Sequence, residues 1–282
     1  LRQAIAAAVA GEAIDGLEVT VNDRVLALTA RPLASGGAVL AFFDLTPVRK
    51  LETVRSDFVA NVSHELKTPL TVVGGFAETL ADEALDPETR RQFASAILAN
   101  TRRMQRIVDD LLDLSRIESG GWTPNPVAVH LQGVAEEALG SARPRAETKG
   151  ISLRVDVEPP GLAVHADPTA LRQVLANLVD NAVRHTSSGE VVVQGRPERG
   201  GVSVTVRDTG AGIRPEHLER IFERFYRVDT ARSREEGGTG LGLAIVKHLV
   251  EAHGGRARAS SEVDQGTAIE VWFPGGAQHA EH

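Results

Sequence analysis

Apolar residues recur at helical spacing between about residues 47 and 84, where they form one continuous stripe. Pro47 stands where a first helical turn would begin, a position that tolerates proline well. The stripe consists of Phe58, Val62, Leu66, Leu70, Val73, Phe76 and Leu80. This pattern predicts one long amphipathic helix with an apolar seam that has to be buried.

A second stripe predicts another helix over residues 87–119. Asp86-Pro87 supplies a cap and a first-turn proline, and Gly120-Gly121 ends the helix. The stripe consists of Phe93, Ile97, Met104, Val108, Leu111, Leu112 and Ile117. Because a lone hairpin cannot bury both seams, we expect a homodimer in which helices 50–84 and 87–119 of two copies form a four-helix bundle.

The segment 1–46 alternates in the manner of strands from about Leu17 to Leu45, with turn residues at Asn22-Asp23 and Ser35-Gly36-Gly37. It resembles the last strands of a PAS sensor domain, although it is too short for a whole one. An unrelated antiparallel meander is the alternative, because strand patterns identify families poorly.

After the hairpin the pattern changes to mixed helices and strands. Residues 122–129 contain two prolines and are interpreted as a linker, and residues 275–282 as a disordered tail. Between them, residues 130–274 alternate helical and strand-like segments, which predicts an α/β two-layer sandwich. The chain is therefore expected to be multidomain, with a small β segment (1–46), a helical hairpin (47–121) and this sandwich.

Composition limits the classes of partner. A formal net charge of -7 and a pI of about 5.8 give no general basic footprint, which speaks against direct nucleic-acid binding. The absence of cysteine excludes disulfides and cysteine–metal sites. No run of about 18 apolar residues occurs, so we expect contact with a membrane only through parts outside this sequence.

The octapeptide Ser63-His64-Glu65-Leu66-Lys67-Thr68-Pro69-Leu70 lies on the first long helix. His64 and Thr68 are four residues apart on the face opposite the apolar seam, so both can point at one visiting molecule. An exposed helical histidine is usually only a solvated side chain, and the motif alone leaves that alternative open. Since neutral imidazole is a nucleophile near pH 7, we interpret His64 as a phosphate acceptor.

Asn177 and Asn181 fall on one face of a predicted helix that ends with Arg184 and His185. Neutral amide oxygens can ligate a Mg²⁺ ion that bridges phosphates, and the two basic residues could touch phosphate oxygens. Asparagines that merely hydrogen-bond each other are the alternative.

Two glycine-containing stretches add candidate nucleotide contacts. Asp208, at the end of a strand, could accept a hydrogen bond from the exocyclic amine of adenine, and Gly210 and Gly212 would let the backbone turn beside the ring. The stretch 238–242 opens a predicted helix over 240–253, where bare N–H groups favour phosphate. Asp-x-Gly-x-Gly alone also describes many ordinary turns.

An aromatic stretch around Phe222 precedes a charged run over residues 229–236. This combination could form a lid, and the alternative is a satellite hydrophobic cluster under a surface loop.

Together, in this order, the five motifs resemble the H, N, G1, F and G2 boxes of two-component sensor histidine kinases, over roughly residues 50–274. The resemblance implies a dimerisation and phosphoacceptor domain of the HisKA type, followed by an HATPase_c domain with a Bergerat-type ATP-binding fold. It also implies ATP and Mg²⁺ as cofactors.

The resemblance further implies a set of site residues. Asn181 and Asn177 would handle Mg²⁺, with Asn181 the first choice as direct ligand. The expected nucleotide contacts are Asn177, Asn181, Arg184, His185, Asp208, Gly210, Gly212, Ile213, Phe222, Gly238, Thr239, Gly240, Leu241 and Gly242.

By the same resemblance, His64 accepts the γ-phosphate, Glu65 is the base, and the phosphoryl group passes to an aspartate in the receiver domain of a response regulator. Thr68 could aim a water at that aspartyl phosphate in a phosphatase reaction. We expect the chain to be the cytoplasmic portion of a bacterial inner-membrane sensor, with a sensor and membrane anchor upstream.

Two rival functions are open at this point. One is a nucleotide-sensing dimer that acts mainly as a phosphatase or scaffold. The other is a Bergerat-fold chaperone or topoisomerase ATPase, which the octapeptide disfavours because such an enzyme has no use for a helical acceptor histidine. The sequence does not say whether phosphate moves within one subunit or across the dimer.

Overall fold

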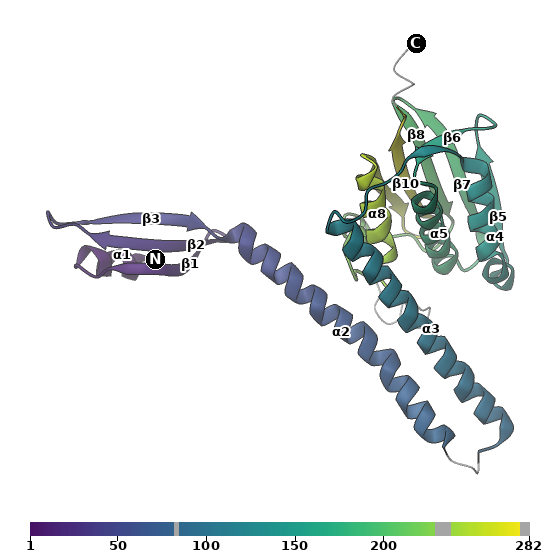
Figure 1. Cartoon of the computed structure of the whole chain (residues 1–282), viewed down its shortest axis with the longest axis horizontal. Coiled ribbons are helices and arrows are strands. Elements are labelled where there is room, and N and C mark those ends of the chain that lie inside the picture. The colour runs from purple at the N-terminus through teal and green to yellow at the C-terminus, as the bar shows by residue number, and fades with distance from the viewer. Residues whose placement is uncertain (82–84, 229–237, 277–282) are drawn as a thin grey trace. The chain divides into compact units, whose positions relative to one another are not determined.

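A computed structural model describes residues 1–81, 85–228 and 238–276 of the chain (Figure 1). The chain separates into two compact units, Leu1–His64 and Glu65–His282. The boundary between them falls inside a long helix that spans Thr46–Leu80.

The first unit begins with a short helix and a three-stranded antiparallel sheet. Helix α1 spans Arg2–Val9, and strands β1 (Ile14–Val21), β2 (Arg24–Pro32) and β3 (Ala38–Asp44) follow, with β2 in the centre. Asn22 and Asp23 link β1 to β2 with positive φ angles of 47° and 62°. Such angles favour a two-residue hairpin turn, which agrees with the turn predicted from these residues.

Two long helices follow the small sheet. Helix α2 spans Thr46–Leu80 and α3 spans Pro87–Glu118, as the two apolar stripes predict. The Asp86 carboxylate caps α3 by accepting hydrogen bonds of 2.9 Å from the N–H groups of Glu88 and Thr89. The rings of Phe76 and Phe93 stack with centroids 4.8 Å apart, which joins the second half of α2 to α3.

The C-terminal domain is built from alternating helices and strands (Figure 1). Its elements are β4 (Val127–His130), α4 (Leu131–Lys149), β5 (Ile151–Val157), β6 (Ala163–Ala166), α5 (Pro168–His185), β7 (Gly189–Glu198), β8 (Gly201–Asp208), α6 (Pro215–Leu218), η1 (Arg220–Phe222), α8 (Gly242–Ala252), β9 (Arg256–Glu262) and β10 (Gly266–Pro274). Strand β4 pairs with β6, and it takes in residues 127–129, which the sequence had assigned to the linker.

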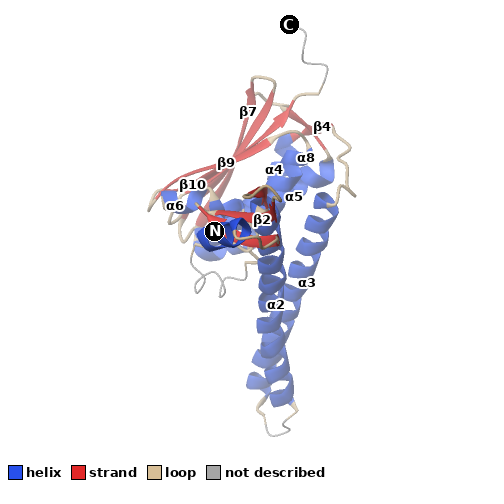
Figure 2. Ribbon diagram, turned by 90° about the vertical axis from the view of Figure 1, so that its left-hand side faces the viewer, coloured by secondary structure: helices blue, strands red, loops and turns tan. Residues whose placement is uncertain are grey.

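The main sheet of this domain has the strand order β5-β7-β8-β10-β9, with only the β5–β7 pair parallel. Helices α4, α5 and α8 cover one face of it (Figures 1 and 2). Val202, Val204 and Val206 of β8 are buried beneath these helices, and the residues between them are more exposed. This arrangement confirms the predicted α/β two-layer sandwich.

Among the described residues, no helix combines the length and the apolar character that a membrane crossing needs.

Candidate active site

The octapeptide lies in the middle of α2, with its polar face turned outward. His64 and Thr68 are exposed one helical turn apart, whereas Leu66 is half-buried and Pro69 is buried. The imidazole is therefore accessible, as a phosphate acceptor has to be.

Glu65, next to the predicted acceptor His64, is held by two arginines that the sequence analysis did not assign. Its Oε2 atom accepts a hydrogen bond of 2.8 Å from Arg103 Nη2 on α3, and one of 3.2 Å from Arg227 Nη2 of the C-terminal domain. All three side chains are at most 17% exposed. Low exposure strengthens such charge-assisted bonds.

Helix α5 presents the two predicted asparagines. Asp167 fixes the start of α5, because its carboxylate accepts hydrogen bonds from the N–H groups of Thr169 and Ala170. Asn177 and Asn181 are both half-buried and four residues apart, so they share one helix face. Arg184, predicted as a phosphate contact, pairs here with the carboxylate of Asp180, and His185 is exposed.

Asp208 ends β8 and is only 7% exposed. Its Oδ1 atom accepts hydrogen bonds of 2.8 Å from the Gly210 N–H and 3.3 Å from the Thr267 N–H. Burial raises the pKa of the Asp208 carboxyl above its ordinary value, while the two N–H donors act in the opposite direction. A buried carboxylate at the end of a strand is suited to accept a hydrogen bond from a single polar group on a planar ring.

The glycines after Asp208 are required by close backbone contacts. A Cβ atom on Gly210 would lie 2.4 Å from the carbonyl oxygen of His185, so the loop rests against the end of α5. Gly212 has a φ angle of +69°, and a Cβ there would lie 2.1 Å from the carbonyl oxygen of Glu262. The next residue, Ile213, donates its N–H to Ser261 Oγ at 2.8 Å.

The glycine-rich stretch before α8 lies against α5 and the aromatic stretch. Gly240 has a φ angle of +73°, and its carbonyl oxygen accepts a hydrogen bond of 2.8 Å from the N–H of Phe225, which has a φ angle of +61°. A Cβ atom on Gly242 would lie 3.0 Å from Asn177 Oδ1. The asparagine helix α5, the aromatic stretch and the glycine-rich stretch therefore meet at the start of α8.

Helix α3 also contacts this region. The Thr239 hydroxyl donates to Asp110 Oδ2 at 2.8 Å, and Gln173 Nε2 of α5 donates to Asp113 Oδ2 at 2.7 Å. Burial raises the pKa of Asp110, and the bond from Thr239 opposes that shift. Leu241 donates its N–H to Thr239 Oγ1 at 3.2 Å, so the threonine links α3 to the first turn of α8.

The remaining predicted contacts are a half-buried Phe222 on η1 and a buried Gly238. The Gly238 carbonyl oxygen accepts a hydrogen bond from Arg227, the same guanidinium that reaches Glu65. The charged run over 229–236, predicted as part of a lid, lies outside the described residues.

The residues present fit a magnesium ion bound through a nucleotide. Because Gly242 has no side chain, it does not cover the amide of Asn177. Asn181 lies one turn further along the same face of α5. Two neutral oxygen donors suit an ion that takes its other ligands from phosphates and water. Within the described part of the chain, no cluster of three or more His, Cys, Asp or Glu residues offers a rival metal site.

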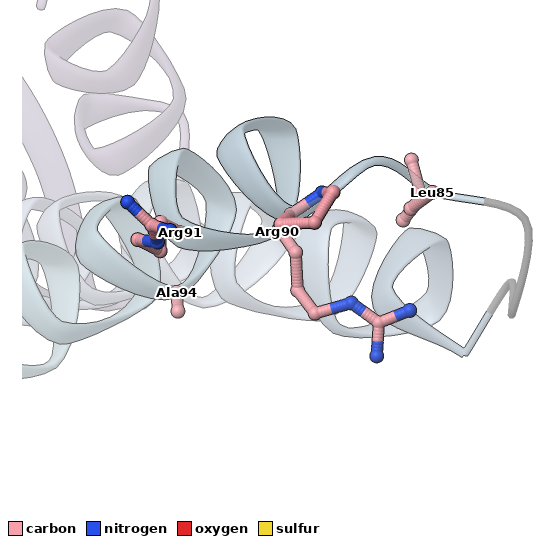
Figure 3. Close-up of a pocket in the computed structure, with 5 residues that line it drawn as sticks. Leu85, Arg90, Arg91 and Ala94 are labelled. Atoms are coloured by element: carbon pink, nitrogen blue, oxygen red, sulfur yellow. The ribbon is translucent and has the colours of Figure 1, made fainter.

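A hollow of about 400 Å³ lies at the tip of the helical hairpin (Figure 3). It is lined by Leu85, Pro87, Arg90, Arg91 and Ala94. None of the predicted site residues takes part in it, so we assign it no role in the chemistry.

The contacts that sequence reasoning missed come mostly from α3. Arg103 and Asp110 are spaced so that they share the face of α3 that buries Ile107 and Leu114. Charged residues on a buried helix face need partners of opposite charge or hydrogen-bonding groups. The placement of Arg103 and Asp110 on an apolar helix face was therefore the sequence signal that could have predicted these contacts.

Two family models match the chain. The model of the "His Kinase A (phospho-acceptor) domain" matches residues 54–120, and that of the "Histidine kinase-, DNA gyrase B-, and HSP90-like ATPase" matches residues 166–277. The fold and the site thus define a phosphoacceptor domain followed by an ATPase domain of this class. Neither match includes residues 1–46, so the PAS interpretation of that segment is not confirmed.

Similar proteins share both domains. The chain is 40% identical over 260 residues to the sensor-like histidine kinase SenX3 of Mycobacterium tuberculosis, which covers 92% of this chain and 62% of SenX3. The crystal structure of full-length ShkA in complex with AMPPNP is 33% identical, with a TM-score of 0.59, over 77% of this chain and 45% of ShkA. This chain belongs to the two-component sensor histidine kinase family.

A further structure shows the same fold at lower identity. The histidine kinase ThkA, solved in complex with the response regulator protein TrrA, has a TM-score of 0.66 and 22% identity over 99% of this chain and 84% of ThkA. The chain spans about three fifths of the length of the curated SenX3 relatives.

Proposed function

We propose that the chain phosphorylates its own His64 with ATP and then transfers the phosphoryl group to an aspartate in the receiver domain of a response regulator. The observation that carries this proposal is the exposed His64 on α2, within the matched phosphoacceptor domain, in a chain that also has the asparagine, aspartate and glycine constellation of the matched ATPase domain.

In the proposed reaction one ring nitrogen of His64 attacks the γ-phosphorus of ATP. A nitrogen–phosphorus bond forms, the bond from the γ-phosphorus to the β–γ bridging oxygen breaks, and ADP leaves. Glu65 takes the proton from the other ring nitrogen, which keeps the attacking nitrogen rich in electrons. The product is a phosphoramidate, which is labile enough to pass its phosphoryl group to a carboxylate.

The nucleotide is held by the C-terminal domain in this proposal. Asp208 accepts a hydrogen bond from the adenine amine, and Gly210 and Gly212 bring the backbone close to the ring. Asn181 and Asn177 would hold Mg²⁺, which when bound would neutralise phosphate charge. The related ShkA was solved with AMPPNP, an ATP analogue, which supports a nucleotide at this domain.

Thr68 supports a second activity, as a phosphatase toward the phosphorylated regulator. Its hydroxyl is on the exposed side of α2, one turn from His64, where it can orient a water. We propose that this hydrolysis, in which water attacks the aspartyl phosphate and inorganic phosphate leaves, uses the same surface of α2 as the transfer from His64.

We propose that the chain acts as a homodimer through α2 and α3. Apolar side chains remain exposed on the hairpin, including Leu70 (57%), Leu98 (49%) and Leu112 (51%). A second copy would cover them in a four-helix bundle.

The test is incubation of the purified chain with γ-labelled ATP and Mg²⁺. We expect wild type to retain the label and His64→Gln to retain none, while calorimetry shows unchanged nucleotide binding in the variant. Label that is lost in acid and kept in alkali indicates phosphohistidine. Label retained by His64→Gln would contradict the acceptor assignment.

A receiver domain added to the labelled protein separates the proposal from its rivals. We expect the label to move to the receiver. ATP hydrolysis without any labelled protein would favour an ATPase, and loss of phosphate from a phosphorylated receiver without self-labelling would favour a phosphatase or scaffold.

A further inference from the structure

The carboxylate of Glu65 lies between two guanidinium groups from different elements. Arg103 Nη2 donates to it at 2.8 Å from α3, and Arg227 Nη2 donates at 3.2 Å from the C-terminal domain. Both donate to the same atom, Oε2. The other oxygen, Oε1, is then the one that suits proton transfer, since a carboxylate oxygen that accepts two strong bonds is a weaker base.

The two arginines differ in what they belong to. Arg103 is on α3, which packs against the same half of α2 as Glu65 through contacts such as the stacked Phe76 and Phe93 rings. Arg227 follows the aromatic stretch and also donates to the Gly238 carbonyl oxygen, so its position depends on the nucleotide-binding domain. Arg103 therefore reaches Glu65 from within the hairpin, whereas Arg227 reaches it from the C-terminal domain.

Burial makes the pair with Arg103 rigid. The side chains of Arg103 and Glu65 are 12% and 17% exposed, so neither is free to sample solvent as surface ion pairs do. By contrast, Arg102 and Arg106 on the same helix are exposed. A planar guanidinium holds a carboxylate in one orientation better than an ammonium does.

We propose that Arg103 is a positioning residue for histidine phosphorylation, which fixes the Glu65 carboxylate through Oε2 so that Oε1 serves as the base for His64. This role rests on the proposed function of Glu65. It adds no covalent step: Arg103 keeps its protons throughout, and the proton from His64 goes to Glu65.

The test compares rates of His64 labelling against ATP concentration for Arg103→Ala, Arg103→Lys and a matched control, Arg102→Ala. We expect Arg103→Ala to lower kcat by about 10- to 100-fold, the usual loss when a reacting group is misplaced. KM for ATP should stay within about 2-fold, because Arg103 lies on α3 and is not one of the predicted nucleotide contacts. Arg103→Lys should restore part of the rate, and Arg102→Ala should behave as wild type.

Variants of Glu65 separate a failure of this inference from a failure of the proposed base. If Glu65→Gln labels as fast as wild type, Glu65 is not the base. If Glu65→Gln is slow while Arg103→Ala is normal, the positioning role is wrong. When Arg103→Ala is added to Glu65→Gln, we expect no further loss of the labelling rate, because Arg103 acts only through the Glu65 carboxylate.

Folding and dimerisation are checked by circular dichroism and light scattering. Should Arg103→Ala fail to fold, Arg103→Gln and Arg103→Lys carry the same comparison. A raised KM with unchanged kcat in any folded Arg103 variant would overturn the inference, since it would place Arg103 in nucleotide binding.

Discussion

At the scale of single residues, Asp208 is a buried carboxyl group for which we propose a role in adenine recognition. The carboxyl is 7% exposed and meets two backbone N–H donors, Gly210 and Thr267. Its raised pKa means that the folded chain holds a proton there more tightly than the unfolded chain does. A buried carboxylate of this kind lowers the free energy of unfolding, and such a loss of stability is common at functional sites.

Replacement of Asp208 by asparagine tests this balance. We expect Asp208→Asn to weaken ATP binding by about 10- to 100-fold, which corresponds to the loss of a hydrogen bond to a charged acceptor. Isothermal titration calorimetry measures the affinity. An unchanged affinity would count against adenine reading by Asp208.

The same variant has a defined pH dependence of stability. From about pH 4 upward the unfolded chain loses the Asp208 proton before the folded chain does, so the free energy of unfolding of wild type falls as pH rises towards the raised pKa. Asparagine does not titrate and so lacks this pH-dependent loss of stability. Thermal unfolding should therefore show Asp208→Asn gaining stability relative to wild type as pH rises. Parallel curves would contradict the burial argument.

Residue chemistry and spacing predicted where the candidate site residues lie in the fold. Asn177, Asn181, Asp208 and the glycines are where their types and spacing placed them, on a helix face, at a strand end and in tight turns. The contact of Arg103 with Glu65 joins residues 38 apart, and that of Arg227 with Glu65 joins residues 162 apart. Such pairs depend on tertiary packing, which a local pattern does not contain.

At the scale of elements, the start of α8 is shaped by what it lies against. Gly240 adopts a left-handed backbone beside Phe225, and Gly242 faces the Asn177 amide. A pattern of glycines at a helix start predicted the motif, but its partners come from α5 and the aromatic stretch. The spacing of apolar residues predicted the helices and strands well, because burial requires that spacing. The ends of these elements depend on caps and strand pairing, as the pairing of β4 with β6 shows.

Gly242→Ala tests the contact between these two elements. The added methyl group would lie 3.0 Å from Asn177 Oδ1 and push the amide aside. We expect ATP affinity in the presence of Mg²⁺ to fall by about 10-fold, the usual order for a displaced ligand group. Calorimetry with and without Mg²⁺ measures it.

Gly140→Ala on α4 is the matched control, because a Cβ there meets nothing within 4 Å. It should leave binding unchanged and stabilise the helix by about 0.5–1 kcal/mol. Equal behaviour of the two variants would show that the Gly242 contact has no part in binding.

At the scale of the whole molecule, the hairpin leaves apolar side chains exposed that a second copy would cover. Leu98, Val108 and Leu112 are 49%, 40% and 51% exposed on α3. The two stripes predicted that one chain leaves apolar surface exposed, which is the basis for the proposed dimer. The sequence could not say whether the proposed transfer to His64 occurs within one subunit or between two.

A charge placed in this exposed stripe should separate the copies. We expect Leu112→Asp to convert the dimer to a monomer, because burying an unpaired carboxylate costs several kcal/mol. Analytical ultracentrifugation measures the mass. Ser95→Asp, at an exposed polar position of the same helix, is the control and should remain dimeric; a dimeric Leu112→Asp would place the interface elsewhere.

Whether His64 carries the phosphoryl group is tested most directly by mapping the phosphate on the protein after reaction with ATP and Mg²⁺ under alkaline handling. Mass spectrometry of the digested chain should find one phosphoryl group, on His64, and acid treatment should remove it. A phosphate on a serine, threonine or aspartate, or none on the peptide that contains His64, would contradict histidine phosphorylation by this chain.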